Sequence, residues 1–204
     1  MLDPESLTLV AITDDLRDGI DGLVARATRA QEGGATMVQL RLKQVEARVL
    51  ADVSRRLVAT LAIPVIVNDR ADVALATGAA GVHVGAEDLS PRALRRVVPA
   101  GFIIGASVGS DSESDDADGA DYVGIGPVFD TWSKADAGEA IGIERFAALQ
   151  ARSARPAVAI GGLTPENARA VMTSGAHGVA VIRSLLGAHD PAAAARALRS
   201  AIGR

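Results

Sequence analysis

The sequence PVIVNDRADVALATGAAGVHVGAED, at residues 64–88, decides the fold that we predict for this chain. Its two short apolar runs, 64–67 and 81–84, are separated by residues 71–77, which have helical spacing and stop at Gly78. Two strands joined by one helix lie parallel with a right-handed crossover, so their carboxyl ends emerge at the same edge of the sheet. Ligands bind at that edge in open and closed α/β folds alike.

Acidic and amide residues follow both apolar runs. Asn68 and Asp69 come after the first, and Glu87 and Asp88 come after the second. Two carboxylates on neighbouring strand ends suit a Mg²⁺ ion that holds a phosphorylated ligand. From this stretch alone, helix capping or turn formation explains the acids at least as well.

The same strand–helix unit recurs along the whole chain, roughly every 25 residues. Apolar runs predict strands at residues 7–12, 36–40, 64–67, 81–84, 102–106, 121–125, 157–160 and 177–182. Helical segments follow at 20–31, 44–61, 71–77, from 90, at 111–118, 143–152, from 164, and from 190 through 202. This strict alternation predicts an α/β protein with a single-domain (β/α)8 TIM barrel over residues 1–204. A doubly wound open sheet is the alternative.

The composition excludes several classes of protein. Among 204 residues, 49% are hydrophobic and only 2% aromatic, which indicates an aliphatic core of the kind found in parallel sheets. A net charge of −4 argues against nucleic acid as a partner, and the absence of cysteine excludes disulfides, zinc–thiolate sites and thiol nucleophiles.

The sequence also predicts where the protein works. Residues 1–6 do not resemble a signal peptide, and no apolar run approaches the roughly 18 residues of a membrane span. We therefore expect a cytoplasmic protein with no membrane partner. The sequence leaves open whether it forms a homo-oligomer.

Polar residues stand at the ends of the predicted strands. Gln39, Arg41 and Lys43 alternate after the second strand, so all three point to one side if the strand continues. Solvent-facing edge residues would give the same pattern. In the sixth strand, Gly124 and Gly126 leave the backbone bare, so that a ligand can approach it.

The later strand ends predict a phosphate site. Gly161 and Gly162 precede a helix that begins near Thr164, where backbone N–H groups and the helix dipole attract anions. A simple tight turn is the alternative. Residues 182–184 after the eighth strand would close the same site. The loop after the sixth strand either adds Thr131, Ser133 and Lys134 to it or is an ordinary surface loop.

The collected residues favour one kind of chemistry. Two carboxylates, three cations (Arg41, Lys43 and Lys134) and a glycine turn surround one predicted mouth, and no strong nucleophile stands among them. The sequence offers no credible Ser-His-Asp set, and the three histidines, His83, His177 and His189, are interpreted as structural. Such a site positions a phosphorylated substrate and stabilises a departing diphosphate.

Six motifs, taken in order, resemble the thiamine-phosphate synthase family. They are Q-L-R-L-K at 39–43, V-N-D-R-A-D at 67–72, H-V-G-A-E-D-L at 83–89, G-A-S at 105–107, D-Y-V-G-I-G-P-V-F-x-T-x-S-K at 121–134 and A-I-G-G-L at 159–163. The resemblance covers essentially the whole chain. It implies a (β/α)8 barrel that joins a pyrimidine diphosphate to a thiazole phosphate with Mg²⁺, giving thiamine phosphate and pyrophosphate. It also implies a dissociative mechanism, in which the C–O bond ionises before the thiazole nitrogen attacks.

The resemblance assigns roles to matching positions. Asp69 and Asp88 would bind the metal. The pyrimidine diphosphate would be held by Gln39, Leu40, Arg41, Leu42, Lys43, Asn68, Ser107 and Lys134, of which Arg41, Lys43, Ser107 and Lys134 would be catalytic. The thiazole phosphate would be held by Thr131, Trp132, Ser133, Gly162, Ile182 and Arg183.

The chain departs from the family pattern at four places. Ala86 replaces the usual Gln, Leu42 a usual acidic residue, Ala135 a usual Pro, and Arg183 a usual Ser. Two alternatives share the fold. The thiazole tautomerases, which are isomerases, lack the full diphosphate and magnesium set and carry a histidine where this chain has Pro127. A non-catalytic regulator would bind a thiazole or thiamine phosphate without turnover.

Overall fold

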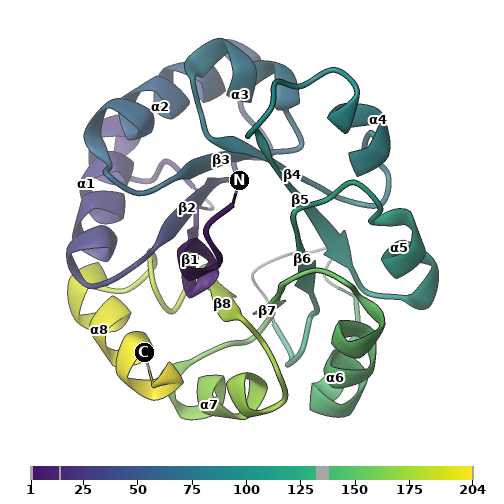
Figure 1. The fold of residues 1–204 in the computed structure, drawn as a ribbon. Helices are drawn as coiled ribbons and strands as arrows, with labels where there is room; N and C mark the ends of the chain where they lie inside the picture. Colours follow the sequence, from purple (N-terminus) through teal and green to yellow (C-terminus); the bar gives the residue numbers. More distant parts are fainter. Residues whose placement is uncertain (1, 14, 132–137, 204) are drawn as a thin grey trace.

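Eight parallel strands close into a barrel, and helices surround it, in the computed structural model of the chain (Figure 1). The structure describes residues 2–13, 15–131 and 138–203. Each strand pairs in parallel with its neighbours in sequence, and β8 closes the barrel against β1, with Val10 opposite Ala180. The predicted TIM barrel is confirmed, and the open-sheet alternative is wrong because both edges of the sheet are paired.

The observed elements follow the predicted alternation. The strands are β1 (Leu9–Ile12), β2 (Met37–Leu40), β3 (Val65–Asn68), β4 (Gly81–Val84), β5 (Ile103–Val108), β6 (Tyr122–Ile125), β7 (Ala157–Ile160) and β8 (Gly178–Val181). The helices are α1 (Gly19–Glu32), α2 (Ala47–Thr60), α3 (Ala71–Thr77), α4 (Pro91–Arg95), α5 (Asp111–Asp116), α6 (Gly142–Arg152), α7 (Pro165–Thr173) and α8 (Pro191–Ile202).

Most boundaries shift by one to three residues, and two of the shifts matter for the barrel interior and the mouth. Leu7 ends a short 3-10 helix, η1 (Pro4–Leu7), in place of starting the first strand. This helix lies over the amino-terminal end of the barrel (Figure 1), and the apolar side chain that suggested a strand is buried in the barrel interior. The fifth strand runs on to Val108, so Ser107 is part of the strand and does not follow it.

The predicted helix starts are confirmed where a capping residue precedes proline. Ser90, Thr164 and Asp190 are the N-caps of α4, α7 and α8, and each is followed by proline. The side chains of Ser90 and Asp190 accept hydrogen bonds from the first turn, and each proline has no N–H that would be left without a partner. No described helix has both the length and the apolar character that crossing a membrane requires.

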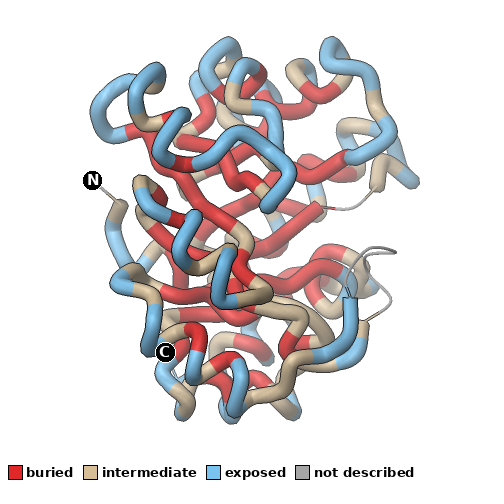
Figure 2. The backbone as a smooth tube through the Cα atoms, turned by 90° about the vertical axis from the view of Figure 1, so that its right-hand side faces the viewer, coloured by how far each residue is buried: buried red, intermediate tan, exposed pale blue. Residues whose placement is uncertain are grey.

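Two apolar layers hold the barrel together. The larger fills the space between strands and helices, and the smaller fills the barrel interior, with Val10, Met37, Ile66, Tyr122 and Val158 among its members. The buried segments accordingly run through the centre of the molecule, with exposed segments outside them (Figure 2). The amino-terminal and central parts of the interior are thus filled by side chains, which leaves the carboxyl ends of the strands for a site.

Candidate active site

A cavity of about 800 Å³ opens at the carboxyl ends of the strands. Segments that end or follow β2 through β8 line it, as the barrel prediction requires. Ten predicted site residues line this cavity: Arg41, Lys43, Asn68, Asp69, Asp88, Ser107, Thr131, Gly162, Ile182 and Arg183. Ala86, one of the departures from the family pattern, also lines it. Trp132, Ser133, Lys134 and Ala135 lie outside the described residues.

The end of β2 presents its polar side chains toward the mouth. Gln39 is buried, and its Nε2 donates to Asn68 Oδ1 over 2.7 Å, which holds the Asn68 amide on the adjacent strand. Arg41 is only 8% exposed, although it lines the cavity. Its backbone N–H donates to Thr13 Oγ1 over 2.8 Å, and the Thr13 hydroxyl donates to the Arg41 carbonyl oxygen over 3.1 Å. Thr13, directly after β1, was not among the predicted site residues, and it fixes the backbone of Arg41.

Leu40 and Leu42 do not line the cavity. Both side chains are buried in the layer between strands and helices. Alternation along the chain explains this, because Gln39 and Arg41 take the inward positions and the leucine that follows each of them points outward. Their place in the pyrimidine-diphosphate set stays a prediction, in which their backbone would make the contact with a ligand at the mouth.

Asp69 adopts a backbone conformation that is uncommon for a residue with a side chain. Its φ is 62°, the single positive φ recorded for a non-glycine residue in the described chain. The Asp69 N–H donates to the His83 carbonyl oxygen over 2.8 Å, and the next N–H, of Arg70, donates to the Asn68 carbonyl oxygen over 2.8 Å. Strained residues of this kind concentrate at functional sites.

The Asp69 carboxyl is held beside that of Asp88. The pKa of Asp69 is raised from 3.8 to about 6, first by burial against the walls of the mouth and then by the negative charge and hydrogen bond of Asp88, while Lys43 and Arg41 partly oppose the increase. Asp88 is also a turn residue, since its Oδ2 accepts the Gly85 N–H over 2.8 Å. Asp88 therefore both stabilises a turn and contributes a carboxylate to the pair with Asp69.

This donor set fits Mg²⁺ in one particular way. Magnesium in substrate-phosphate sites is bound through one or two carboxylates, with phosphate oxygens and water completing the shell. Asp69 and Asp88 supply two carboxylates whose mutual repulsion a cation would relieve. Within residues 2–13, 15–131 and 138–203, no cluster of three or more His, Cys, Asp or Glu side chains forms a metal cage of its own.

The opposite side of the mouth is built mainly from backbone. Gly161 and Gly162 have φ values of 99° and 62°, and a Cβ at Gly162 would lie 2.5 Å from the Asp130 carbonyl oxygen. The turn is fixed by hydrogen bonds to its carbonyl oxygens. Phe129 N–H donates to Gly161 over 3.1 Å, Asn167 Nδ2 to Gly162 over 2.9 Å, and Ser184 Oγ to Leu163 over 2.6 Å.

Two glycines at the end of β6, Gly124 and Gly126, have a packing role in addition to the predicted approach of a ligand. A Cβ at Gly126 would lie 2.1 Å from the Ile160 carbonyl oxygen, so close packing on β7 excludes any side chain there. A Cβ at Gly124 would lie 3.2 Å from Cε1 of His83, so this glycine makes room for the imidazole. Both residues line the cavity. Packing alone is a sufficient reason for both glycines, whether or not a ligand approaches them.

Arg183 and His83 connect the mouth to neighbouring parts of the barrel. The exposed Arg183 lines the main cavity and also a smaller neighbouring pocket with Asp15, Arg17 and Gly187. His83, which was interpreted as structural, is buried and contacts the predicted site residue Ser107, with His83 Nε2 3.0 Å from Ser107 Oγ. The sequence places His83 inside a strand, but it does not show which side chains of neighbouring strands come into contact.

Comparison with known proteins agrees with the geometry. The sequence model of the family described as thiamine monophosphate synthase matches residues 9–185. The thiamine-phosphate synthase of Azorhizobium caulinodans is 46% identical over 204 residues, covering 98% of this chain and 96% of that protein. That of Xanthobacter autotrophicus is 44% identical, covering 98% and 97%.

A solved structure supports the same assignment. The thiamine phosphate pyrophosphorylase from Pyrococcus furiosus superposes with a TM-score of 0.86 at 37% identity, covering 98% of this chain and 96% of that one. The chain therefore belongs to the thiamine monophosphate synthase family, the transferases that condense the pyrimidine and thiazole halves in thiamine biosynthesis.

Proposed function

We propose that the protein carries out this condensation with Mg²⁺, and that the two sides of its mouth take one substrate each. The pyrimidine diphosphate would bind against β2–β5 and the thiazole phosphate against the turns after β6–β8. The observation that carries the proposal is the charge arrangement on the first side. There the Asp69 carboxyl interacts with that of Asp88 and lies in the field of Arg41 and Lys43.

The diphosphate side combines both signs of charge. Asp69 and Asp88 would hold Mg²⁺, which when bound neutralises part of the diphosphate charge. Arg41 supplies a fixed fork of N–H donors, because its backbone is bonded to Thr13 and its side chain is buried. Asn68, held by Gln39, and Ser107 add neutral polar groups at the same edge.

These residues suit a reaction that begins with departure of the diphosphate. The C–O bond between the 5-methylene carbon of the pyrimidine and the diphosphate breaks, and its electron pair leaves with the diphosphate oxygen. The thiazole nitrogen then donates its lone pair to this methylene carbon, which forms the C–N bond of thiamine phosphate. Neither step needs a protein nucleophile. Donors placed around the growing negative charge are the principal requirement, and each such donor is typically worth about 10²–10³-fold in rate.

The thiazole phosphate side relies on the glycine turn. Gly162 lines the cavity next to the start of α7, where N–H groups and the helix dipole favour an anion. Arg183 would add a positive charge from the end of β8. Thr131 lies on the same side, and we expect the neighbouring Trp132 and Ser133 to complete this site and Lys134 to act on the diphosphate. Lys134→Ala should lower kcat more than it weakens binding of the thiazole phosphate.

One assay tests the proposal directly. Purified protein is mixed with 4-amino-2-methyl-5-(diphosphooxymethyl)pyrimidine, 4-methyl-5-(2-phosphooxyethyl)thiazole and Mg²⁺, and release of pyrophosphate and thiamine phosphate is followed with and without a chelator. Formation of both products only with the metal supports the proposal. Turnover that persists in the chelator would refute the metal requirement. Binding of the thiazole phosphate without any product would favour the isomerase or the regulator. We further propose that the protein acts in the cytoplasm on these small-molecule partners.

A further inference from the structure

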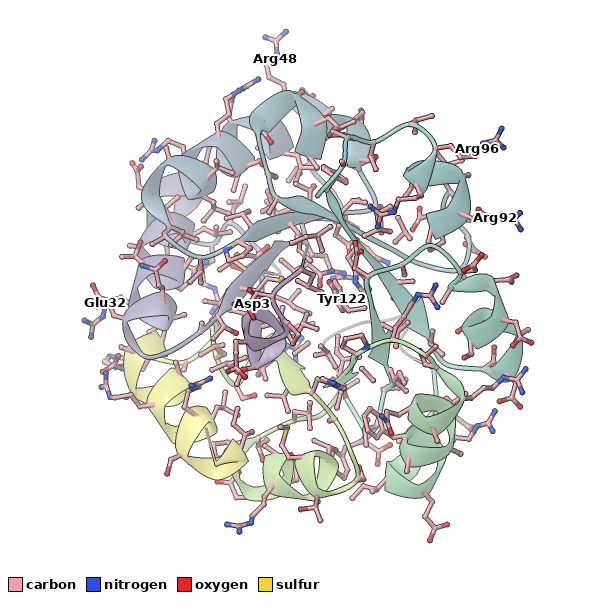
Figure 3. All side chains as sticks on the ribbon, in the orientation of Figure 1. Asp3, Glu32, Arg48, Arg92, Arg96 and Tyr122 are labelled. Carbon is pink, nitrogen blue, oxygen red and sulfur yellow. The ribbon has the colours of Figure 1, made fainter. Side chains whose placement is uncertain are left out.

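A chain of three polar side chains crosses the inside of the barrel toward the mouth. Tyr122 on β6 is 2% exposed, His83 on β4 is 8% exposed, and Ser107 on β5 is half-buried at the cavity. The Tyr122 hydroxyl lies 3.0 Å from His83 Nδ1, and His83 Nε2 lies 3.0 Å from Ser107 Oγ. Tyr122 lies near the centre of the barrel in Figure 3. Both imidazole nitrogens are thus occupied, one on the buried side and one on the substrate side.

Inward-facing glycines make room for this chain. A Cβ at Gly105 would lie 2.3 Å from Cζ of Tyr122 and 2.5 Å from Nδ1 of His83. A Cβ at Gly124 would lie 3.2 Å from Cε1 of His83. The imidazole of His83 and the phenol of Tyr122 can come into contact because both positions are glycine. Strand interiors disfavour glycine, so its presence here indicates a local packing requirement.

The direction of the hydrogen bonds follows from the surroundings of Tyr122. Burial raises its pKa, so the phenol keeps its proton. Its other neighbours in the inner layer are apolar, and His83 Nδ1 is its hydrogen-bond partner among the residues that the structure describes. A buried hydroxyl that donates to no acceptor costs about 1–3 kcal/mol. The Tyr122 hydroxyl therefore donates to Nδ1.

The tautomer of His83 is then determined. In a neutral imidazole one nitrogen carries the proton and the other accepts, and the partner of one nitrogen sets the role of the other. With Nδ1 accepting, Nε2 carries the proton and donates to Ser107 Oγ. The Ser107 hydroxyl keeps its own proton for a partner in the cavity. In the opposite tautomer, Ser107 would donate to Nε2 and present only lone pairs to an anion.

We propose that Tyr122 is a positioning residue, which acts through His83 to make the Ser107 hydroxyl a hydrogen-bond donor toward an anionic substrate at the mouth. The consequence for the diphosphate rests on the proposed function, whereas the tautomer does not. A donor at Ser107 helps most as negative charge grows on the departing diphosphate. Loss of the Tyr122 hydroxyl should therefore lower kcat more than it changes KM for the thiazole phosphate.

The first test needs no substrate. Protein labelled with ¹⁵N at histidine is examined by NMR near pH 8, and His83→Asn identifies the His83 signals among the three histidines. We expect a protonated Nε2 and an unprotonated Nδ1 in the native protein, and loss of this preference in Tyr122→Phe. A protonated Nδ1 in the native protein, or an unchanged tautomer in Tyr122→Phe, would overturn the proposal. This result is independent of whether the protein turns over the expected substrates.

The second test is a double-mutant cycle. Tyr122→Phe should lower kcat about tenfold, the equivalent of one net hydrogen bond, and should have almost no further effect in the Ser107→Ala background. Ile103→Val, a packing change in the same inner layer, is the control, and its effect should be the same in both backgrounds. An equal loss from Tyr122→Phe with and without Ser107 would mean that the phenol acts through packing. Thermal unfolding of each variant shows that the fold survives.

Discussion

The two sides of the barrel mouth are built on different principles. The side formed by β2–β5 presents charged and polar side chains, namely Arg41, Lys43, Asp69 and Asp88. The side formed by the turns after β7 and β8 presents a glycine turn, a helix start and a single arginine. Strain is placed differently as well: a non-glycine residue takes a positive φ on the first side, and glycines take it on the second.

The first side therefore depends on the charges of its side chains, and the second depends on the shape of its backbone. On the first side, the environment of a carboxyl shifts its pKa, and neighbouring strands hold Arg41 and Asn68 through Thr13 and Gln39. On the second side, hydrogen bonds hold the backbone, and a single added methyl group would collide with it. The first side should therefore fail when charge is removed, and the second when volume is added.

The largest effect is expected from removing a carboxylate. Asp69→Asn and Asp88→Asn should each lower kcat/KM by about 10³-fold, because the paired site for Mg²⁺ is lost. Asparagine tolerates the positive φ of position 69, so the backbone should remain intact. Steady-state kinetics across a Mg²⁺ titration measure the change.

The matched control is Asp72→Asn. This carboxylate follows the same strand but is bound to Arg70 by bonds of 2.8 and 2.6 Å, and it does not line the cavity. Its activity should stay within twofold of the native value, about 0.4 kcal/mol. Near-native turnover in either Asp69→Asn or Asp88→Asn would remove the metal assignment from that residue.

The next effect is expected from adding volume on the second side. Gly162→Ala places a Cβ 2.5 Å from the Asp130 carbonyl oxygen. It also gives a residue with a side chain a positive φ, which lowers the free energy of unfolding by about 1–3 kcal/mol. The turn must move, so KM for the thiazole phosphate should rise about 30-fold, whereas binding of the pyrimidine diphosphate should be preserved. Separate titrations with each substrate measure the two affinities.

Gly78→Ala separates strain from collision. Gly78 has a similar φ of 71° but no atom within 4 Å of a new Cβ, and it ends α3 away from the cavity. We expect comparable loss of thermal stability in the two variants and loss of substrate binding only in Gly162→Ala. Equal losses of thiazole phosphate binding would show that global destabilisation, not the shape of the turn, is responsible.

A smaller effect is expected from Arg183. Its side chain is exposed, and exposed charges typically contribute up to about 1 kcal/mol. Arg183→Ser should raise KM for the thiazole phosphate about fivefold, and the rise should disappear as salt screens the charge. Arg17→Ser is the control, since Arg17 is paired with Asp15 over 2.9 Å and lines only the smaller pocket. A KM that is unaffected by Arg183→Ser would mean that the backbone turn binds the phosphate without it.

The smallest effect is expected in stability, and it has the opposite sign to the loss of activity. The pKa of Asp69 is about 6 in the folded protein and 3.8 in a model peptide, so the folded state binds more protons between these values. The free energy of unfolding therefore falls as pH rises from about 4 to 6, and it stays at the lower value above pH 6. Asp69→Asn removes this decrease. Since the side chain is exposed, we expect a gain of only about 0.5 kcal/mol at pH 8 and almost none near pH 4.

Thermal unfolding at the two pH values measures this gain in the absence of Mg²⁺. Asp88→Asn should give a smaller gain, because it removes the repulsion but leaves the burial of Asp69, which is the larger cause of the raised pKa. A loss of stability at pH 8 in both variants would show that attraction to Lys43 and Arg41 outweighs the repulsion between the two acids.

The sequence by itself determined the barrel and most of the residues at its mouth. Strands and helices alternate regularly, and the carboxyl ends of parallel strands must meet, so Arg41, Asp69 and Gly162 were predicted to share a site that they do line. Two leucines lie away from the cavity for local reasons. Leu7 is apolar because it fills the end of the barrel from a 3-10 helix, and Leu42 lies outward because the polar residues beside it take the inward direction.

Only the tertiary structure decided how these residues are held. The pairing of Asp69 with Asp88, the support of Arg41 by Thr13, and the chain from Tyr122 through His83 to Ser107 all cross between strands. Residue order gives the direction of a strand and which neighbours it has. The twist and closure of the barrel set which side chains meet across it, and therefore fixed the pKa of one carboxyl and the hydrogen-bond partner of each imidazole nitrogen.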